Sequence, residues 1–178
     1  MRLIGSYPSV GDIKVRRFSF EDEHGPMRTK EFEIALSTFE RLREKFPVLS
    51  MNLDPHPSNM DVAMYIPAQP GLSVKVLLIL QNRNELHLVV SGSLYQWFWY
   101  PCSNPEQVER YVEAVSGLLS GEFRIVEHWR GGRVVKAQLQ RPDGSGWKTI
   151  ATDIDALAII PWPRKTLKVV QIQPSSSR

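Results

Sequence analysis

The sequence has one cysteine and no long apolar run. Because Cys102 has no second cysteine to pair with, an internal disulfide is excluded. The longest apolar runs, such as Val76–Leu80, fall far short of the roughly 18 to 20 residues that span a bilayer. Residues 1–17 lack the apolar core of a signal peptide. We therefore expect a cytoplasmic protein that does not enter a membrane.

Motifs for metal, phosphate or nucleotide binding are also missing. The four histidines are not spaced as helical metal ligands, and neither Cys-x-x-Cys nor His-Glu-x-x-His occurs. Glycine pairs occur without the further glycines of a phosphate-binding loop. The sequence thus predicts no metal and no cofactor, and it favours a protein that is not an enzyme.

Three residues remain as weak catalytic candidates: Cys102, His128 and Asp54. Cys102 precedes a predicted helix, whose N-terminus would lower the pKa of a thiol, although a lone cysteine is more often structural. Asp54 begins the stiff loop Asp54-Pro55-His56-Pro57, which either presents a carboxylate beside an imidazole or simply connects two elements. His128 falls within a predicted strand, where a structural role is the alternative.

Composition and periodicity predict one α+β domain over residues 1–178. Hydrophobic residues make up 42% of the chain and charged residues 23%, as in ordinary globular proteins. We expect a mainly antiparallel sheet of about six to eight strands with two helices packed on it. One helix is predicted over 104–121, with Asn104 as its cap and Pro105 in its first turn. The other is predicted from Ser37 to Phe46, before Pro47.

The remaining segments read as strands in a repeating order. Residues 37–100 and 104–152 each suggest one helix followed by three strands, an α-β-β-β pseudo-repeat based on element order alone. Gly131-Gly132 predicts a tight hairpin that sets Glu127 opposite Lys136. We also expect an N-terminal hairpin within residues 1–36, formed by 13–20 and 29–36. The C-terminal segment, 153–178, should hold an edge strand near 166–173 and a frayed tail.

The segment Tyr95–Tyr100 is unusually aromatic and suggests a partner-binding surface. On a strand, Tyr95, Trp97 and Trp99 share one face, which would either pack in the core or be exposed to a partner. Trp162 lies in a second rigid, apolar and basic stretch and joins them as a candidate. The leading hypothesis is accordingly a non-enzymatic protein-interaction domain, which either binds a partner protein or self-associates.

Charge is polarised and supports a second hypothesis. Residues 123–178 carry 10 Lys and Arg against 4 Asp and Glu, whereas the rest of the chain is slightly acidic. A nucleic-acid-binding module would use Arg130, Arg133 and Lys148, with Trp129 or Trp147 as stacking groups. The third hypothesis is an enzyme or small-ligand protein whose site residues are scattered along the chain.

Overall fold

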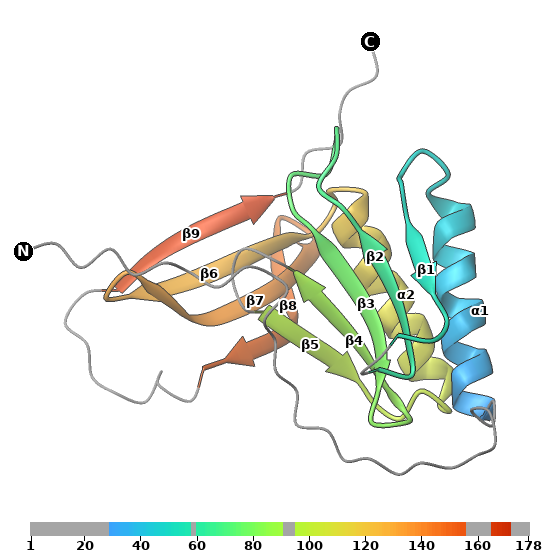
Figure 1. The fold of residues 1–178 in the computed structure, drawn as a ribbon. Coiled ribbons are helices and arrows are strands. Elements are labelled where there is room, and N and C mark those ends of the chain that lie inside the picture. The colour runs from blue at the N-terminus through green and yellow to red at the C-terminus, as the bar shows by residue number, and fades with distance from the viewer. Residues whose placement is uncertain (1–28, 58–59, 91–94, 156–164, 172–178) are drawn as a thin grey trace, which may run out of the picture.

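The computed structural model describes residues 29–57, 60–90, 95–155 and 165–171, which form two helices and two antiparallel sheets (Figure 1). The first part of the chain contains α1 (Lys30–Lys45), β1 (Asn52–Asp54), β2 (Val62–Ile66), β3 (Val76–Gln81), β4 (Glu85–Val90) and β5 (Tyr95–Trp99). The second contains α2 (Pro105–Leu119), β6 (Arg124–Arg130), β7 (Arg133–Asp143), β8 (Gly146–Ile154) and β9 (Lys165–Gln171). The predicted fold class is confirmed at the level of α+β with antiparallel sheets.

The expected single sheet of six to eight strands is wrong in its details. Nine strands are described, and they divide into a five-stranded sheet in the order β1-β2-β3-β4-β5 and a four-stranded sheet in the order β8-β7-β6-β9. The α-β-β-β pseudo-repeat is not confirmed, because five strands follow α1 and four follow α2. Since strands longer than a few residues twist, two smaller sheets can enclose one core where a single wide sheet would not.

The first helix begins a full two turns earlier than predicted. Thr29 caps it by accepting a hydrogen bond from the backbone N–H of Phe32 on its side-chain oxygen, at 3.2 Å. The buried residues of α1 then recur at helical spacing: Phe32, Ala35, Thr38, Phe39 and Leu42. The prediction of a strand over 29–36 is therefore wrong, and its partner segment, 13–20, lies outside the described residues.

The second helix forms as predicted. Asn104 accepts a hydrogen bond from the N–H of Glu106 at 3.0 Å, and Pro105 occupies the first turn. After the last turn, Gly121 adopts a φ of 75°, which a glycine tolerates without steric cost. Gly117, inside the helix, is needed for packing, because a Cβ there would lie 2.5 Å from the ring of Phe123. Phe123 thereby brings the start of the four-stranded sheet onto α2.

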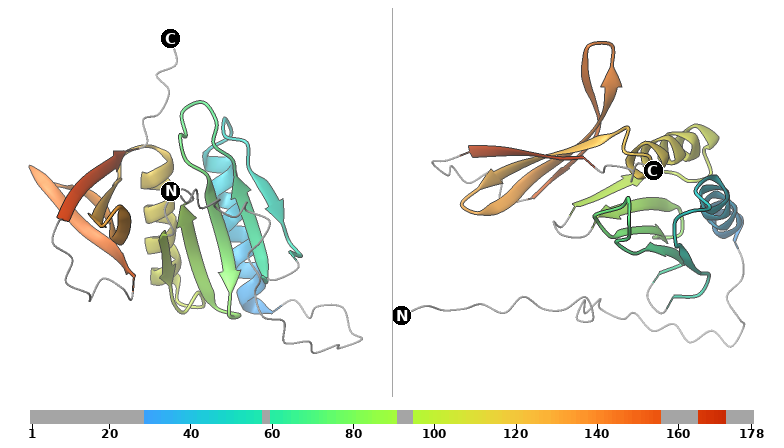
Figure 2. Two further views of the ribbon diagram at one scale, coloured as in Figure 1. Left: turned by 60° about the vertical axis from the view of Figure 1, so that its left-hand side comes forward. Right: turned by 90° about the horizontal axis from the view of Figure 1, so that it is seen from above.

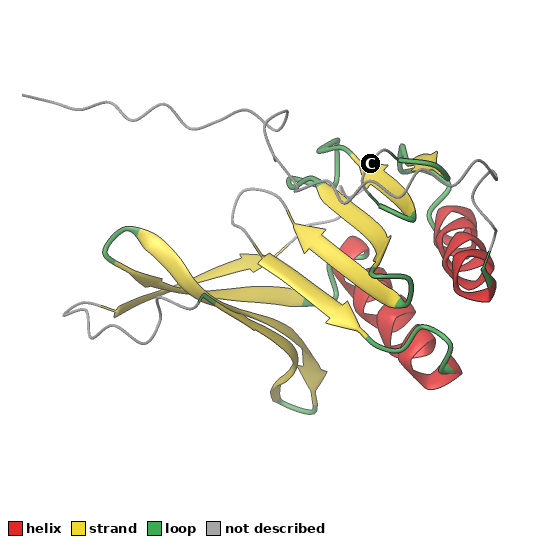
Figure 3. Cartoon of the chain, turned by 60° about the horizontal axis from the view of Figure 1, so that its bottom comes forward, coloured by secondary structure: helices red, strands yellow, loops and turns green. Residues whose placement is uncertain are grey.

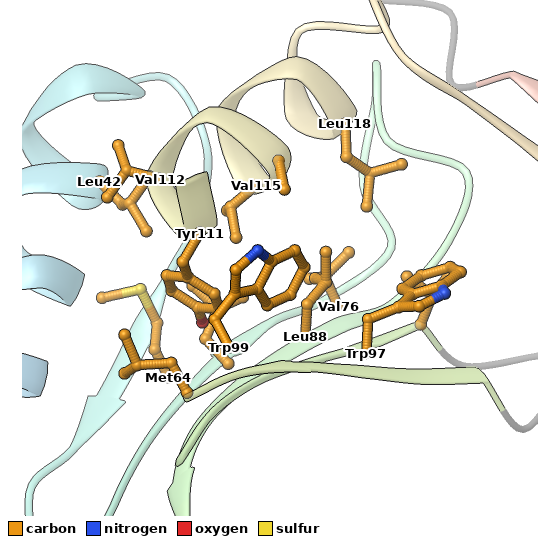
Figure 4. Packing of buried hydrophobic residues seen from close by; sticks show 14 of the residues in the cluster. Leu42, Met64, Val76, Leu88, Trp97, Trp99, Tyr111, Val112, Val115 and Leu118 are labelled. Carbon is orange, nitrogen blue, oxygen red and sulfur yellow. The ribbon is translucent and has the colours of Figure 1, made fainter. Parts of the chain in front are cut away.

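Both helices pack on one face of the five-stranded sheet (Figures 2 and 3). Alternate residues of β2 to β5 point toward them, and β5 contributes its three aromatic side chains Tyr95, Trp97 and Trp99. Trp99 packs edge-on against Tyr111 of α2, with ring centroids 5.3 Å apart (Figure 4). One hydrophobic cluster continues from this layer to Ile125, Ala137 and Leu139 of the four-stranded sheet.

The four-stranded sheet contains the predicted hairpin, with a register one residue away from that expected. Gly131 and Gly132 make the turn with φ of 56° and 81°, and Arg130 pairs with Arg133. A bulge between His128 and Trp129 then shifts the pairing, so that Lys136 lies opposite His128. Glu127 instead pairs with Ala137 on one side and with Lys168 of β9 on the other.

The predicted C-terminal edge strand is confirmed as β9, which pairs antiparallel with β6 along its length. The two sheets meet where the Tyr95 hydroxyl donates a hydrogen bond to the buried carboxylate of Glu127. Nearby, the backbone N–H of Gln96 donates to Asp153 Oδ2 at 3.1 Å. Among the described residues, neither helix has both the length and the apolar character required to cross a membrane.

Candidate functional site

The three catalytic candidates lie on separate elements. Asp54 ends β1, and its carboxylate accepts a hydrogen bond from the N–H of His56 at 3.0 Å, a local turn interaction. His56 stacks on Phe32 of α1, with ring centroids 5.9 Å apart. His128 lies in β6 of the other sheet. No contact among Asp54, Cys102 and His128 appears in the described part of the chain, so the structure does not assemble them into one site.

Cys102 lines a shallow cavity between the two helices, about 330 Å³ in volume. Across this cavity Arg41 and Glu109 form a two-point ion pair, at 2.7 and 2.8 Å. Burial is the main cause that raises the pKa of the Cys102 thiol to about 11, and the nearby carboxylates of Glu31 and Asp61 raise it further. The expected lowering of this pKa by the helix N-terminus is therefore wrong, because the side chain is buried in apolar surroundings.

The aromatic residues predicted to bind a partner are in the core. Tyr95, Trp97 and Trp99 are all buried beneath α2, so they are not available to a partner as a surface. The strand instead exposes the alternate residue Phe98, and Tyr100 just after it is also exposed. Trp162 lies outside the described residues.

The residues proposed for nucleic-acid binding do not form one patch. Arg133 begins β7 and is paired with Asp155 at 2.6 Å, while Arg130 lies across the same hairpin turn. Lys148 pairs with Arg141 near the other end of β7, which places it roughly 25 Å along the strand. Trp129 points to the inner side, where its indole N–H donates to Glu127 at 2.7 Å.

A different surface combines exposed apolar groups with positive charge. It is the face of the four-stranded sheet opposite the core residues Ile125 and Leu139, and we call it the outer face. Three aliphatic side chains stand out there: Leu167 is 68% exposed, Ile154 59% and Val169 52%. The outer face comprises Arg124, Val126, His128, Arg130, Lys136, Gln138, Gln140, Trp147, Thr149, Thr152, Ile154, Leu167 and Val169.

Hydrogen bonds link the polar side chains of the outer face into a strip. His128 Nε2 and Gln138 Oε1 are 2.8 Å apart, and Gln138 Nε2 donates to Thr149 Oγ1 at 3.3 Å. Gln140 Nε2 also donates to Thr149 Oγ1, at 3.2 Å, and Arg124 Nε donates to Gln140 Oε1 at 3.0 Å. The strip crosses three strands and lies between the exposed aliphatic residues of β8 and β9.

Charge on the outer face has one sign. Arg124, Arg130 and Lys136 are cationic, and none of the described residues that define the outer face is acidic. Two acidic residues of the sheet, Glu127 and Asp153, point to its inner side, where they bond Tyr95 and Gln96. The outer face is therefore suited to a partner that offers apolar groups together with negative charge.

Comparisons of the chain with protein-family models, curated proteins and solved structures find no match. Leu167, Val169 and Arg124 of this surface were not among the site residues predicted from the sequence. Apolar alternation in the predicted C-terminal strand was a usable signal for the first two, since residues two apart on a strand share a face.

Proposed function

We propose that this chain is a protein-interaction domain whose outer face binds an acidic, partly apolar segment of another protein. The observation that supports it is the combination of three exposed aliphatic side chains with Arg124 and Lys136, on a face whose described residues include no carboxylate. Exposed aliphatic groups lose water-accessible apolar area when a partner covers them. The two cations would select an acidic partner and reject a basic one.

The same observations favour protein over nucleic acid. Exposed aliphatic residues fit side chains of a protein, whereas a single-stranded nucleic acid is bound by aromatic rings with open faces. The one tryptophan of the outer face, Trp147, already has the guanidinium of Arg124 over its ring, at 4.0 Å. A base would have to displace that arginine in order to stack on the same side of the ring.

Self-association through two copies of the outer face is disfavoured. In a two-fold symmetric contact the same patch meets itself, so the cations of one copy would face those of the other. Neither copy would supply a carboxylate from this face. The hypothesis of self-association would therefore require another surface of the molecule.

A direct test uses two synthetic amphipathic peptides of the same apolar pattern, one with glutamates and one with lysines. Calorimetry should show binding of the acidic peptide alone. Binding should be lost in Leu167→Asp and Val169→Asp, which place a negative charge on the outer face. Val48→Asp is the matched control, since Val48 is 88% exposed and lies outside that face.

Two results would contradict the proposal. One is equal binding of the acidic and basic peptides, which would show that charge plays no part. The other is acidic-peptide binding that survives both Leu167→Asp and Val169→Asp while those variants remain folded. A single-stranded oligonucleotide that binds in a strongly salt-dependent way, and competes with the peptide, would favour the nucleic-acid alternative instead.

A further inference from the structure

We infer that Arg124 is the anchor of the outer face and holds a carboxylate of the bound segment through the two terminal nitrogens of its guanidinium. This inference rests on the proposed function and specifies its chemistry. A guanidinium presents five N–H groups in a rigid planar fork, which matches the two oxygens of a carboxylate. The inference depends on how the structure orients that fork.

Two contacts hold the guanidinium of Arg124 in place. Its Nε–H donates to Gln140 Oε1 at 3.0 Å, and its central carbon lies 4.0 Å from the centroid of the Trp147 ring. The first contact fixes the rotation of the group, and the second fixes its height above the sheet. Because the hydrogen bond uses the Nε side of the fork, the edge formed by Nη1 and Nη2 is left for another acceptor.

The orientation of Gln140 is itself determined by a neighbour. Its amide nitrogen donates to Thr149 Oγ1 at 3.2 Å, so its oxygen must be the atom that faces Arg124. Thr149 Oγ1 also accepts a hydrogen bond from the amide nitrogen of Gln138, at 3.3 Å. With both acceptor positions of the hydroxyl occupied, its proton remains available as a further donor beside Arg124.

The contacts of the Arg124 guanidinium differ from those of four other arginines in the described residues. Four arginines each have a carboxylate within 2.7 Å: Arg41, Arg110, Arg133 and Arg141. Arg124 has an amide oxygen and an aromatic ring as its partners instead. A cation that is oriented by neutral groups keeps its full charge for a ligand, and little side-chain entropy is lost when the ligand binds.

Acetate is the probe that tests this inference without a partner. In NMR titrations at constant ionic strength, acetate should produce a saturable shift of the Arg124 Nε–H and Trp147 indole signals, and chloride should not. Arg124→Lys keeps the charge and removes the fork, so the acetate-dependent shift of the Trp147 signal should be lost. Arg43→Lys, an exposed arginine on α1, is the matched control and should leave both signals responsive.

The outcomes separate this inference from the proposed function. If acetate gives no saturable shift, or the same Trp147 shift in Arg124→Lys, the assignment of Arg124 is overturned whatever the peptides do. In the peptide assay, Arg124→Lys should weaken binding of the acidic peptide about tenfold. A peptide with glutamine in place of each glutamate should bind the wild type and Arg124→Lys alike. If Leu167→Asp abolishes binding of the acidic peptide and Arg124→Lys has no effect, the outer face remains the binding surface, but Arg124 is not its anchor. Trp147→Leu provides a second variant that loosens the fork without removing charge.

Discussion

The hydroxyl of Tyr95 in β5 donates a hydrogen bond to the carboxylate of Glu127 in β6, and this bond joins the two sheets. Glu127 is only 3% exposed, and its other oxygen accepts from the indole N–H of Trp129 at 2.7 Å. A buried carboxylate is tolerated when donors satisfy its oxygens. The junction between the sheets therefore depends on a polar contact as well as on apolar packing.

Tyr95→Phe should lower the free energy of unfolding by about 1 to 3 kcal/mol, because it leaves a buried carboxylate oxygen without its donor from the other sheet. Urea unfolding followed by tryptophan fluorescence measures the change. Tyr100→Phe is the matched control, since Tyr100 is exposed and should change stability little. Equal stability of the two variants would show that the bond between the sheets contributes nothing.

Gly117→Ala should destabilise the protein by about 1 to 3 kcal/mol, although alanine is the better helix former. The new Cβ would lie 2.5 Å from the Phe123 ring, and the ring cannot withdraw without opening the contact between α2 and the four-stranded sheet. Thermal unfolding measures the effect. Gly117→Ala combined with Phe123→Leu should recover part of the loss. Gly146→Ala should be nearly neutral, because its Cβ would come no closer than 3.8 Å to the Asp143 carbonyl oxygen. A stabilising Gly117→Ala would contradict the packing described.

Burial of His87 should make the free energy of unfolding fall as the pH drops below about 6.5. Burial lowers the pKa of His87 below 6.5, and the hydrogen bond to Glu85 only partly offsets this. The imidazole of the unfolded chain then binds a proton more readily than that of the folded protein. The stability that the neutral, buried His87 contributes is therefore full above pH 6.5 and is lost as the pH falls below that value. Gln96 and Phe98 of β5 are the other groups that contact the ring, and neither is charged.

The measurement for His87 is urea unfolding at pH 7.5 and pH 5.5 for the wild type and His87→Gln. The variant should lose less stability than the wild type between the two pH values. His56→Gln, which alters an exposed histidine, should behave as the wild type does. An unchanged pH dependence in His87→Gln would show that another group is responsible.

The thiol of Cys102 should react slowly with iodoacetamide in the folded protein. With its pKa raised to about 11, the thiolate fraction near pH 8 is roughly a hundredfold smaller than for an ordinary thiol. Mass spectrometry of samples alkylated with and without urea gives the two rates. Rapid labelling of the folded protein at low denaturant would contradict the buried position of this side chain.

Local signals predicted local structure well. Asn104, Pro105 and Gly121 mark both ends of α2, and Gly131-Gly132 marks a hairpin turn that does form. The same logic failed for α1, where Ser37 resembles a cap. In the structure the Ser37 hydroxyl donates to the carbonyl of Ile34 at 3.0 Å, inside a helix that had already begun. A capping pattern cannot distinguish these two cases when the apolar stripe continues upstream.

The positions of the site residues depend on strand register, which no local sequence pattern contains. The extra residue of the bulge lies in β7 and places Lys136 opposite His128, on the other face of the sheet from Glu127, whose carboxylate bonds Tyr95. Since side chains alternate along a strand, a shift of one residue changes which neighbours share a face. Arg124 and Trp147 come together only through the register of β6 with β7 and of β7 with β8. Their pairing therefore could not be predicted from the sequence without that register.

The order of the strands also bears on how the molecule is made. The strands of the five-stranded sheet pair with their neighbours in the chain, so this sheet can assemble progressively while translation continues. In the four-stranded sheet, β6 acquires its second neighbour only when β9 is synthesised, after β7 and β8. A nascent chain shorter than about 171 residues would thus lack a complete outer face. The outer face is therefore completed only once β9 has been synthesised, when Leu167 and Val169 take their places beside β6.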